Sequence, residues 1–148
     1  MSWTLTSLVN ALNGTTAYGL IVARIGGATI RRGAEDIFFA EGYRLPYPVA
    51  GAFTIGNVVI TAGTFAHLTT VFPRVLVHEA RHTRQYAWLG PLFWPVYAVG
   101  LIWSWLLTGD RASRNPLERA AGLSDGGYVA KPLRAIWSHH GDPATPQR

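Results

Sequence analysis

The sequence predicts a single, mostly helical α+β domain in which a short β-hairpin packs on one helix and an apolar helical hairpin follows. Three observations support this class. The chain has 148 residues, which suffices for one domain with a substantial core. A β-rich segment precedes a stretch with three- and four-residue hydrophobic spacing, and an uncharged apolar run comes next. We assign residues 1–138 to the domain and 139–148 to a flexible tail.

The first third of the chain is expected to begin with a helix and to continue without regular structure. Residues 2–23 mix short apolar runs with glycines, which predicts a helix broken near Asn13-Gly14. We interpret residues 25–33 as a turn-rich link. Residues 34–48 hold two short apolar pieces and two prolines, so we expect them to be irregular.

Residues 49–63 predict a β-hairpin or two edge strands. Phe53, Ile55 and residues 58–60 are aromatic or β-branched, and Gly56-Asn57 between them is a turn signal. The next element, from Pro73 to Leu89, has the spacing of a helix, with Pro73 in its first turn and Thr69 or Thr70 as its cap. One face of this helix would carry Val71, Val75, His78, His82 and Gln85.

Two more helices are expected after the stop signal Gly90-Pro91. The apolar run predicts a helix from about Pro95 to Leu107. The segment NPLERAAG predicts a short helix with Asn115 as N-cap, Pro116 at its first position and Gly122 at its end.

The motif HEARH, residues 78–82, has the spacing of a zinc-binding catalytic helix. Histidines four residues apart share one helix face, so His78 and His82 can bind one ion at about 2.0–2.1 Å. Glu79 would then lie beside the metal and take a proton from zinc-activated water during hydrolysis of a peptide bond. The alternative is a surface helix whose histidines have no role.

A catalytic zinc usually has three protein ligands, so one more is required. The candidates downstream are Glu118, Asp110, Asp125, His139 and His140. Glu118 is preferred because it lies on a second predicted helix and its carboxylate could point back at the first. It also stands three residues after Asn115, the spacing of a capping box, so a purely structural role for Glu118 is the competing interpretation.

HEARHTRQY, followed by LGP, an aromatic-rich apolar stretch and NPLERAA, resembles gluzincin-type zinc metallopeptidases over about residues 54–123. The resemblance is to small bacterial proteins with a HExxHxxQ helix and a later NPxE segment. It implies a minimal zincin-like core, with His78, His82 and Glu118 binding Zn²⁺ and Glu79 as general base. It also implies that a strand at about residues 55–61 is the edge that pairs with an extended peptide substrate. The supporting acid expected four residues after the ligand glutamate is Gly122 here, and Asp125 is the nearest substitute.

The composition and charge of the chain limit the classes of partner that it can bind. The chain is 49% hydrophobic and 14% charged with a net charge of +5, and its basic residues are scattered rather than clustered. Scattered arginines exclude a nucleic-acid footprint, whereas a membrane surface contact and a homo-oligomer stay open. The absence of cysteine excludes thiolate ligands and disulfides. No secretory signal is recognisable, so we expect a cytoplasmic location, with membrane association left open.

The uncharged run at residues 89–107 is long enough for a membrane span. A straight span would, however, separate His82 from Glu118 by a bilayer core of about 30 Å. If Glu118 is a ligand, Gly90-Pro91 must therefore turn the second helix back along the first.

Three functions compete on the sequence: a zinc metallopeptidase, a non-catalytic zinc-binding protein, and a small membrane-associated protein whose HExxH is accidental. A set of two histidines and one carboxylate also suits iron(II).

Of the other polar residues, Tyr97 or Tyr128 would donate to an oxyanion or pack in the core. Gln85 would bond near the site or face solvent, and Arg81 and Arg84 are expected to be solvated.

Overall fold

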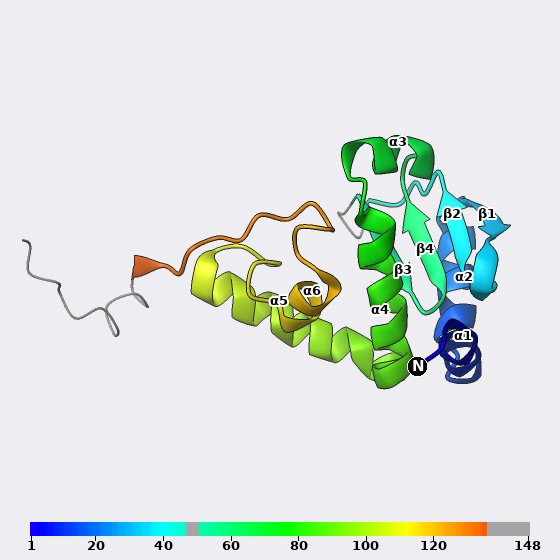
Figure 1. Cartoon of the computed structure of the whole chain (residues 1–148), viewed down its shortest axis with the longest axis horizontal. Coiled ribbons are helices and arrows are strands. Elements are labelled where there is room, and N and C mark those ends of the chain that lie inside the picture. Colours follow the sequence, from blue (N-terminus) through cyan, green and yellow to red (C-terminus); the bar gives the residue numbers. More distant parts are fainter. Residues whose placement is uncertain (47–50, 136–148) are drawn as a thin grey trace, which may run out of the picture.

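A computed structural model describes residues 1–46 and 51–135 and confirms the mostly helical α+β class (Figure 1). The helices are α1 (Trp3–Leu12), α2 (Thr15–Ile25), α3 (Phe65–Val71), α4 (Val75–Leu89), α5 (Phe93–Thr108) and α6 (Pro116–Ala121). The strands are β1 (Thr29–Arg32), β2 (Phe38–Glu41), β3 (Ala52–Ile55) and β4 (Val58–Thr61). Short 3₁₀ turns lie at Ala34–Asp36 and Gly90–Leu92.

The predicted break in the first helix is confirmed at Asn13-Gly14. Gly14 has φ 81°, a left-handed conformation that glycine adopts without a steric penalty. The Asn13 side chain accepts hydrogen bonds from the backbone N–H and the hydroxyl of Thr15, at 3.1 and 2.7 Å. The chain therefore turns between α1 and α2. α2 packs against the sheet, whereas α1 packs against α2 and α4.

The interpretation of residues 25–33 as a link and of residues 34–48 as irregular is wrong where strands form. The segment contains β1 and β2, which pair with each other in antiparallel fashion. Each strand has only four residues, too few for alternation to stand out. Their order comes from long-range pairing, because β2 runs parallel to β4 with Phe38 opposite Val58. Local sequence carries no signal for that partner.

The predicted hairpin is confirmed, and it packs on the HEARH helix. β3 and β4 pair in antiparallel fashion around Gly56-Asn57, and β3 lies against α4. In the described residues the strand order is β1-β2-β4-β3, so β3 is an edge strand and β4 is interior. The expectation that residues 55–61 form the edge is therefore wrong for β4, since β2 covers it.

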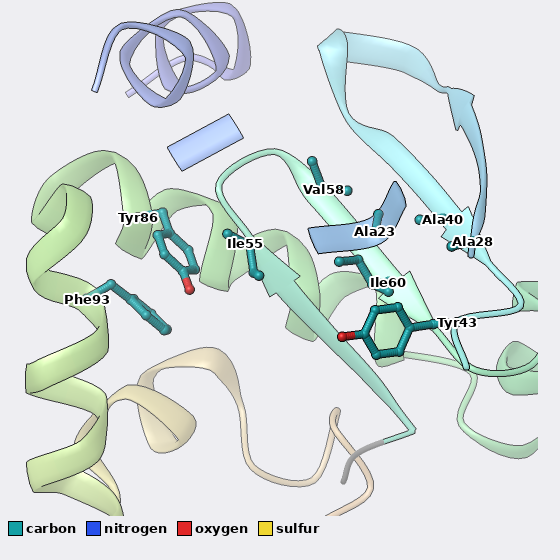
Figure 2. Close-up of a cluster of buried hydrophobic side chains, with 9 residues drawn as sticks. All are labelled: Ala23, Ala28, Ala40, Tyr43, Ile55, Val58, Ile60, Tyr86 and Phe93. Carbon is teal, nitrogen blue, oxygen red and sulfur yellow. The ribbon is translucent and has the colours of Figure 1, made fainter. Parts of the chain in front are cut away.

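The main core lies between α2, the sheet and the ends of α4 and α5 (Figure 2). In Figure 2 the rings of Tyr86 and Phe93 lie beside Ile55, at the end of the core nearest the HEARH helix. The two rings are stacked with centroids 3.9 Å apart. The buried members are Ala23, Ala28, Ala40, Tyr43, Ile55, Val58, Ile60, Tyr86 and Phe93.

The start of the HEARH helix differs from the expectation. Thr69 and Thr70 do not cap it, because they belong to a separate helix, α3, and their hydroxyls donate to carbonyls of that helix. α4 begins at Val75, so Pro73 lies before its first turn. The α3 cap is Thr64, whose hydroxyl accepts from the backbone N–H of His67 at 3.3 Å. The hydrophobic spacing continues from α3 into α4, so the sequence does not indicate the boundary between the two helices.

α4 ends at Gly90-Pro91 as predicted, and Gly90 has φ 56°. α5 starts at Phe93, slightly earlier than expected, with Pro95 in its first turn where proline is tolerated. α5 leaves the foot of α4 across the view in Figure 1 and does not run back along it. α6 then packs against both helices. Within the described residues, the helical stretch Val75–Thr108 is long and apolar enough to cross a membrane by length and composition alone.

Candidate metal centre

The two motif histidines converge on one point. His78 and His82 lie one turn apart on α4 and are 2% and 6% exposed. Their Nε2 atoms are 3.1 Å apart. Residues four apart on a helix share a face, and α6 with Gly122 packs over that face of α4. The pair is therefore buried and aimed at a common position.

Glu118 completes a three-donor cluster with the histidines. Its Oε2 atom lies 3.2 Å from Nε2 of His78 and 3.7 Å from Nε2 of His82. A tetrahedral ion with bonds of about 2.0–2.1 Å holds neighbouring ligand atoms about 3.3 Å apart. The three measured separations bracket that value, so these donors fit a single zinc-sized ion.

Hydrogen bonds on the outer side of each ring fix the histidine tautomers. Nδ1 of His78 lies 3.0 Å from the carbonyl oxygen of Gly122, and Nδ1 of His82 lies 2.8 Å from Oε1 of Gln85. Both partners are acceptors, so each Nδ1 carries the proton and donates it. Each Nε2 then offers a lone pair to the cluster, as metal-ligating histidines do.

Glu118 is oriented from the side opposite the histidines. The Tyr97 hydroxyl on α5 donates to its Oε1, whereas its buried Oε2 accepts no hydrogen bond among the described residues. A buried carboxylate oxygen without a donor is costly unless a cation satisfies it. A capping box is not formed, because the backbone N–H of Asn115 donates to the carbonyl of Ala112 instead. Tyr97 is therefore a positioning residue rather than an oxyanion donor.

The charges of the cluster favour a cation. Burial by itself lowers the pKa of His78, but the adjacent carboxylate of Glu118 and the negative charge of Glu79 outweigh it and raise that pKa. Burial by itself raises the pKa of Glu118, but the two histidines and Tyr97 outweigh it and hold that pKa well below its usual range. Glu118 thus stays ionised, as a metal ligand must.

Glu79 lies in the same pocket in a different environment. It is 3% exposed, and its Oε2 accepts a hydrogen bond of 2.7 Å from the Thr54 hydroxyl on β3. Burial raises the pKa of Glu79 against the opposing effects of His82 and Thr54. Two buried glutamates beside one histidine pair therefore have pKa values shifted in opposite directions, a pattern that separates a proton-transferring group from an ionised ligand.

The other proposed ligands have different positions. Oδ1 of Asp110 accepts from the backbone N–H groups of Ala112 and Ser113 within its own turn. Asp125 pairs with Arg74 and Arg81 at 2.7 Å each. Neither aspartate belongs to the donor cluster found among the described residues. His139 and His140 lie outside the described residues.

Arg81 is a structural tie and not a solvated side chain as expected. Its Nη1 donates to the carbonyl oxygen of Ala121 at 2.7 Å and to Oδ2 of Asp125 at the same distance. These bonds join α4 to the end of α6. They hold the Gly122 carbonyl in reach of His78.

The cluster opens into a cavity of about 270 Å³. α4 supplies one wall, β3 another, and α5 with the residues around α6 the rest. Besides the cluster and Glu79, its lining includes Phe53, Thr54, Phe93, Tyr97, Arg111 and Tyr128. The Tyr128 ring centroid lies 5.9 Å from that of His78, and burial raises the pKa of the Tyr128 hydroxyl. The cavity is large enough to admit one or two side chains of a substrate.

Sequence reasoning missed two contributors to the site, the Gly122 carbonyl and Thr54. The Gly122 carbonyl is invisible because a backbone oxygen has no residue-type signal. Thr54 lies next to Phe53 on β3, and only the strand alternation hinted that it faces α4. Gln85 was weighed, and its place one turn after His82 was the usable signal.

Gln85→Ala is expected to lower zinc affinity by about 10–100-fold, the usual cost of losing a partner that orients a ligand. Gln85 accepts from Nδ1–H of His82, and its Nε2 donates to the Leu117 carbonyl at 2.9 Å, so one side chain links the ligand to α6. Competition with a fluorescent chelator would measure the change. Gln85→Glu keeps the acceptor and should retain most of the affinity. Equal affinity in wild type and Gln85→Ala would contradict this role.

No family model matches the chain, and neither a curated protein nor a solved structure matches it.

Proposed function

We propose that the chain is a minimal zinc-dependent metallopeptidase of the gluzincin type, with His78, His82 and Glu118 as ligands and Glu79 as general base. One observation carries the proposal. Three donor atoms converge at zinc-like separations, and a second buried glutamate shares their cavity with its pKa raised. An accidental HExxH on a surface helix would need neither the burial nor the second carboxylate.

The zinc, when bound, polarises the scissile carbonyl and makes water a better nucleophile at neutral pH. Glu79 accepts the proton of the attacking water as the C–O bond forms. It then delivers that proton to the leaving amine nitrogen as the C–N bond breaks. Burial supports this role, because a raised pKa lets a carboxylate both take and give a proton near neutrality. Thr54 holds the carboxylate in place through its hydroxyl.

The edge strand β3 supports a peptide as substrate. Its one pairing partner in the described sheet is β4, so its outer N–H and C=O groups can pair with an extended chain. Phe53 and Thr54 of β3 also line the cavity, so a peptide on this edge would lie next to the cluster. Tyr128 is the candidate donor to the developing oxyanion. Arg111 at the rim could pair with a substrate carboxylate.

The proposal extends to a cytoplasmic, membrane-associated location. The apolar stretch that includes α5 supports the membrane part of this statement. The bend at Gly90-Pro91 argues against a straight span, because it keeps His82 and Glu118 in one cluster.

Metal analysis and a peptide-cleavage assay test the proposal together. Protein purified without chelator should hold about one zinc per chain, and cleavage of a mixed peptide library should stop on chelation and return with zinc. His78→Ala should lose the metal. His67→Ala, a matched change on the exposed face of α3, should keep it. Less than about half an equivalent of zinc, or iron(II) in its place, would rule the proposal out.

A further inference from the structure

The two N-terminal helices have inverted polarity. The fully buried residues of α1 and α2 are small or polar, whereas soluble proteins turn mainly large apolar residues inward. Among the described residues of the two helices, only Leu20 and Val22 of α2 pack against the hydrophobic core as large, partly buried side chains. The buried residues are Thr6, Ser7, Asn10, Thr15, Thr16, Gly19 and Ala23. The exposed large apolar residues of the same helices are Leu5, Leu8, Leu12, Tyr18, Ile21 and Ile25.

α5 shows the same inversion most strongly. The small and polar residues Gly100 and Ser104 face the protein. The Ser104 hydroxyl donates to the carbonyl of Asp110 at 2.6 Å and accepts from the backbone N–H of Arg114 at 2.7 Å. A Cβ on Gly100 would lie 2.5 Å from Oδ1 of Asn115, so no larger residue fits there. The outward residues are Val96, Val99, Ile102, Trp103, Trp105 and Leu106; we call them the outer face of α5.

This arrangement suits apolar surroundings. In membrane proteins, small residues and polar bonds join helices to one another, and large apolar side chains face lipid. In water the same helices would leave a broad apolar surface exposed, which monomeric soluble proteins rarely tolerate. Two charged groups at the margins fit an interface with water. Arg134 lies 5.1 Å above the ring of Trp105, and Arg84 lies 4.1 Å above that of Trp3. Tryptophan and arginine are both typical of the membrane–water boundary.

The exposed basic residues near α5 indicate which kind of membrane surface the helix would bind. Arg114 and Lys131 are exposed, and no ion pair involves them in the described part of the chain. The acids of the same stretch are engaged elsewhere. Asp110 accepts bonds within its own turn, Glu118 belongs to the metal cluster, and Asp125 pairs with two arginines. A basic margin around an apolar face complements an anionic lipid surface.

We infer that the outer face of α5 docks on an anionic bilayer, with the helix axis in the membrane plane. The 16 residues of α5 extend about 24 Å at 1.5 Å per residue, short of a hydrocarbon core of about 30 Å. An in-plane helix places its apolar side chains among the acyl chains and its basic neighbours at the headgroups. The opposite face of α5 supplies Phe93 and Tyr97 to the cavity, so the metal centre lies beside the membrane. The consequence that its substrates are membrane-proximal segments rests on the proposed function, whereas the docking does not.

Vesicle binding by the full-length protein tests this inference without reference to zinc or cleavage. The probes are vesicles of phosphatidylcholine alone and of phosphatidylcholine mixed with phosphatidylglycerol. Flotation and tryptophan emission would report binding. We expect binding to the mixed vesicles only, weakened by salt. Val99→Glu should weaken it at least about tenfold, because it puts a charge among the acyl chains. Val71→Glu is the matched control on α3, at similar exposure and away from α5, and should bind as wild type does.

Arg114→Gln combined with Lys131→Gln should reduce binding to the mixed vesicles while circular dichroism stays unchanged. Full binding by Val99→Glu would overturn the inference. So would a dimer that Val99→Glu dissociates in a protein that binds no vesicles, because a second copy would then cover the face. Retention in membranes after an alkaline carbonate wash would indicate a span and would also overturn it.

Discussion

Glu118→Ala is expected to lower zinc affinity by more than about 100-fold, beyond the loss typical of an orienting partner. The substitution removes the carboxylate oxygen that lies 3.2 Å from Nε2 of His78 and leaves two histidines to hold the ion. It also removes the negative charge that favours a cation in this buried cluster. Competition against a chelator of known affinity, at fixed pH, would give the ratio to wild type.

Asn115→Ala is the matched control for that experiment. Asn115 caps the same helix through its Oδ1, which accepts from the backbone N–H of Leu117 at 3.0 Å. Losing the cap should cost about 1 kcal/mol of unfolding free energy. It should change zinc affinity far less than Glu118→Ala does. If the two variants lose affinity equally, Glu118 acts only by stabilising α6, and the three-ligand site is wrong.

The parts of the fold that the sequence predicts are those with local causes. Asn115, Pro116 and Gly122 mark both ends of α6 because caps and stops act over one helical turn. Gly56-Asn57 marks the hairpin for the same reason. β1 and β2 have no such marks. They become strands because β4 offers a parallel partner from twenty residues further along, and pairing at that distance leaves no local pattern.

The site shows the same division between local and distant causes. The relative positions of His78, Glu79 and His82 can be predicted from the sequence, because their spacing within one helical turn sets their geometry. The hydrogen bond that orients His78 cannot be predicted in this way, because its acceptor is a backbone carbonyl. Gly122 has φ 86°, and a Cβ there would lie 2.3 Å from Nη1 of Arg81 and 2.9 Å from Oδ2 of Asp125. An acid at this position would be strained by this φ and would displace the side chains of Arg81 and Asp125. Its orienting task falls to the carbonyl of Gly122 itself, which accepts from Nδ1 of His78.

Glu79→Gln is expected to reduce peptide cleavage by about 10²–10⁴-fold, the contribution typical of a general acid–base group, while zinc stays bound. Glutamine has nearly the same shape, and its Oε1 can still accept the hydrogen bond from Thr54. It cannot take a proton from water. Parallel measurement of kcat/KM on a cleaved peptide and of zinc content would separate the two effects.

Thr54→Val tests whether the carboxylate itself or its placement matters. It removes the 2.7 Å bond to Glu79 but keeps the proton acceptor, so cleavage should fall less than in Glu79→Gln. Rates that match wild type in Glu79→Gln would exclude the proposed base. Zinc lost together with activity would instead mean that Glu79 holds the cluster electrostatically, since its charge is among those that raise the pKa of His78. Zinc retained with no cleavage even in the wild type would leave a structural or sensing metal site. In that case the buried carboxylate beside the ligands would need a role other than proton transfer.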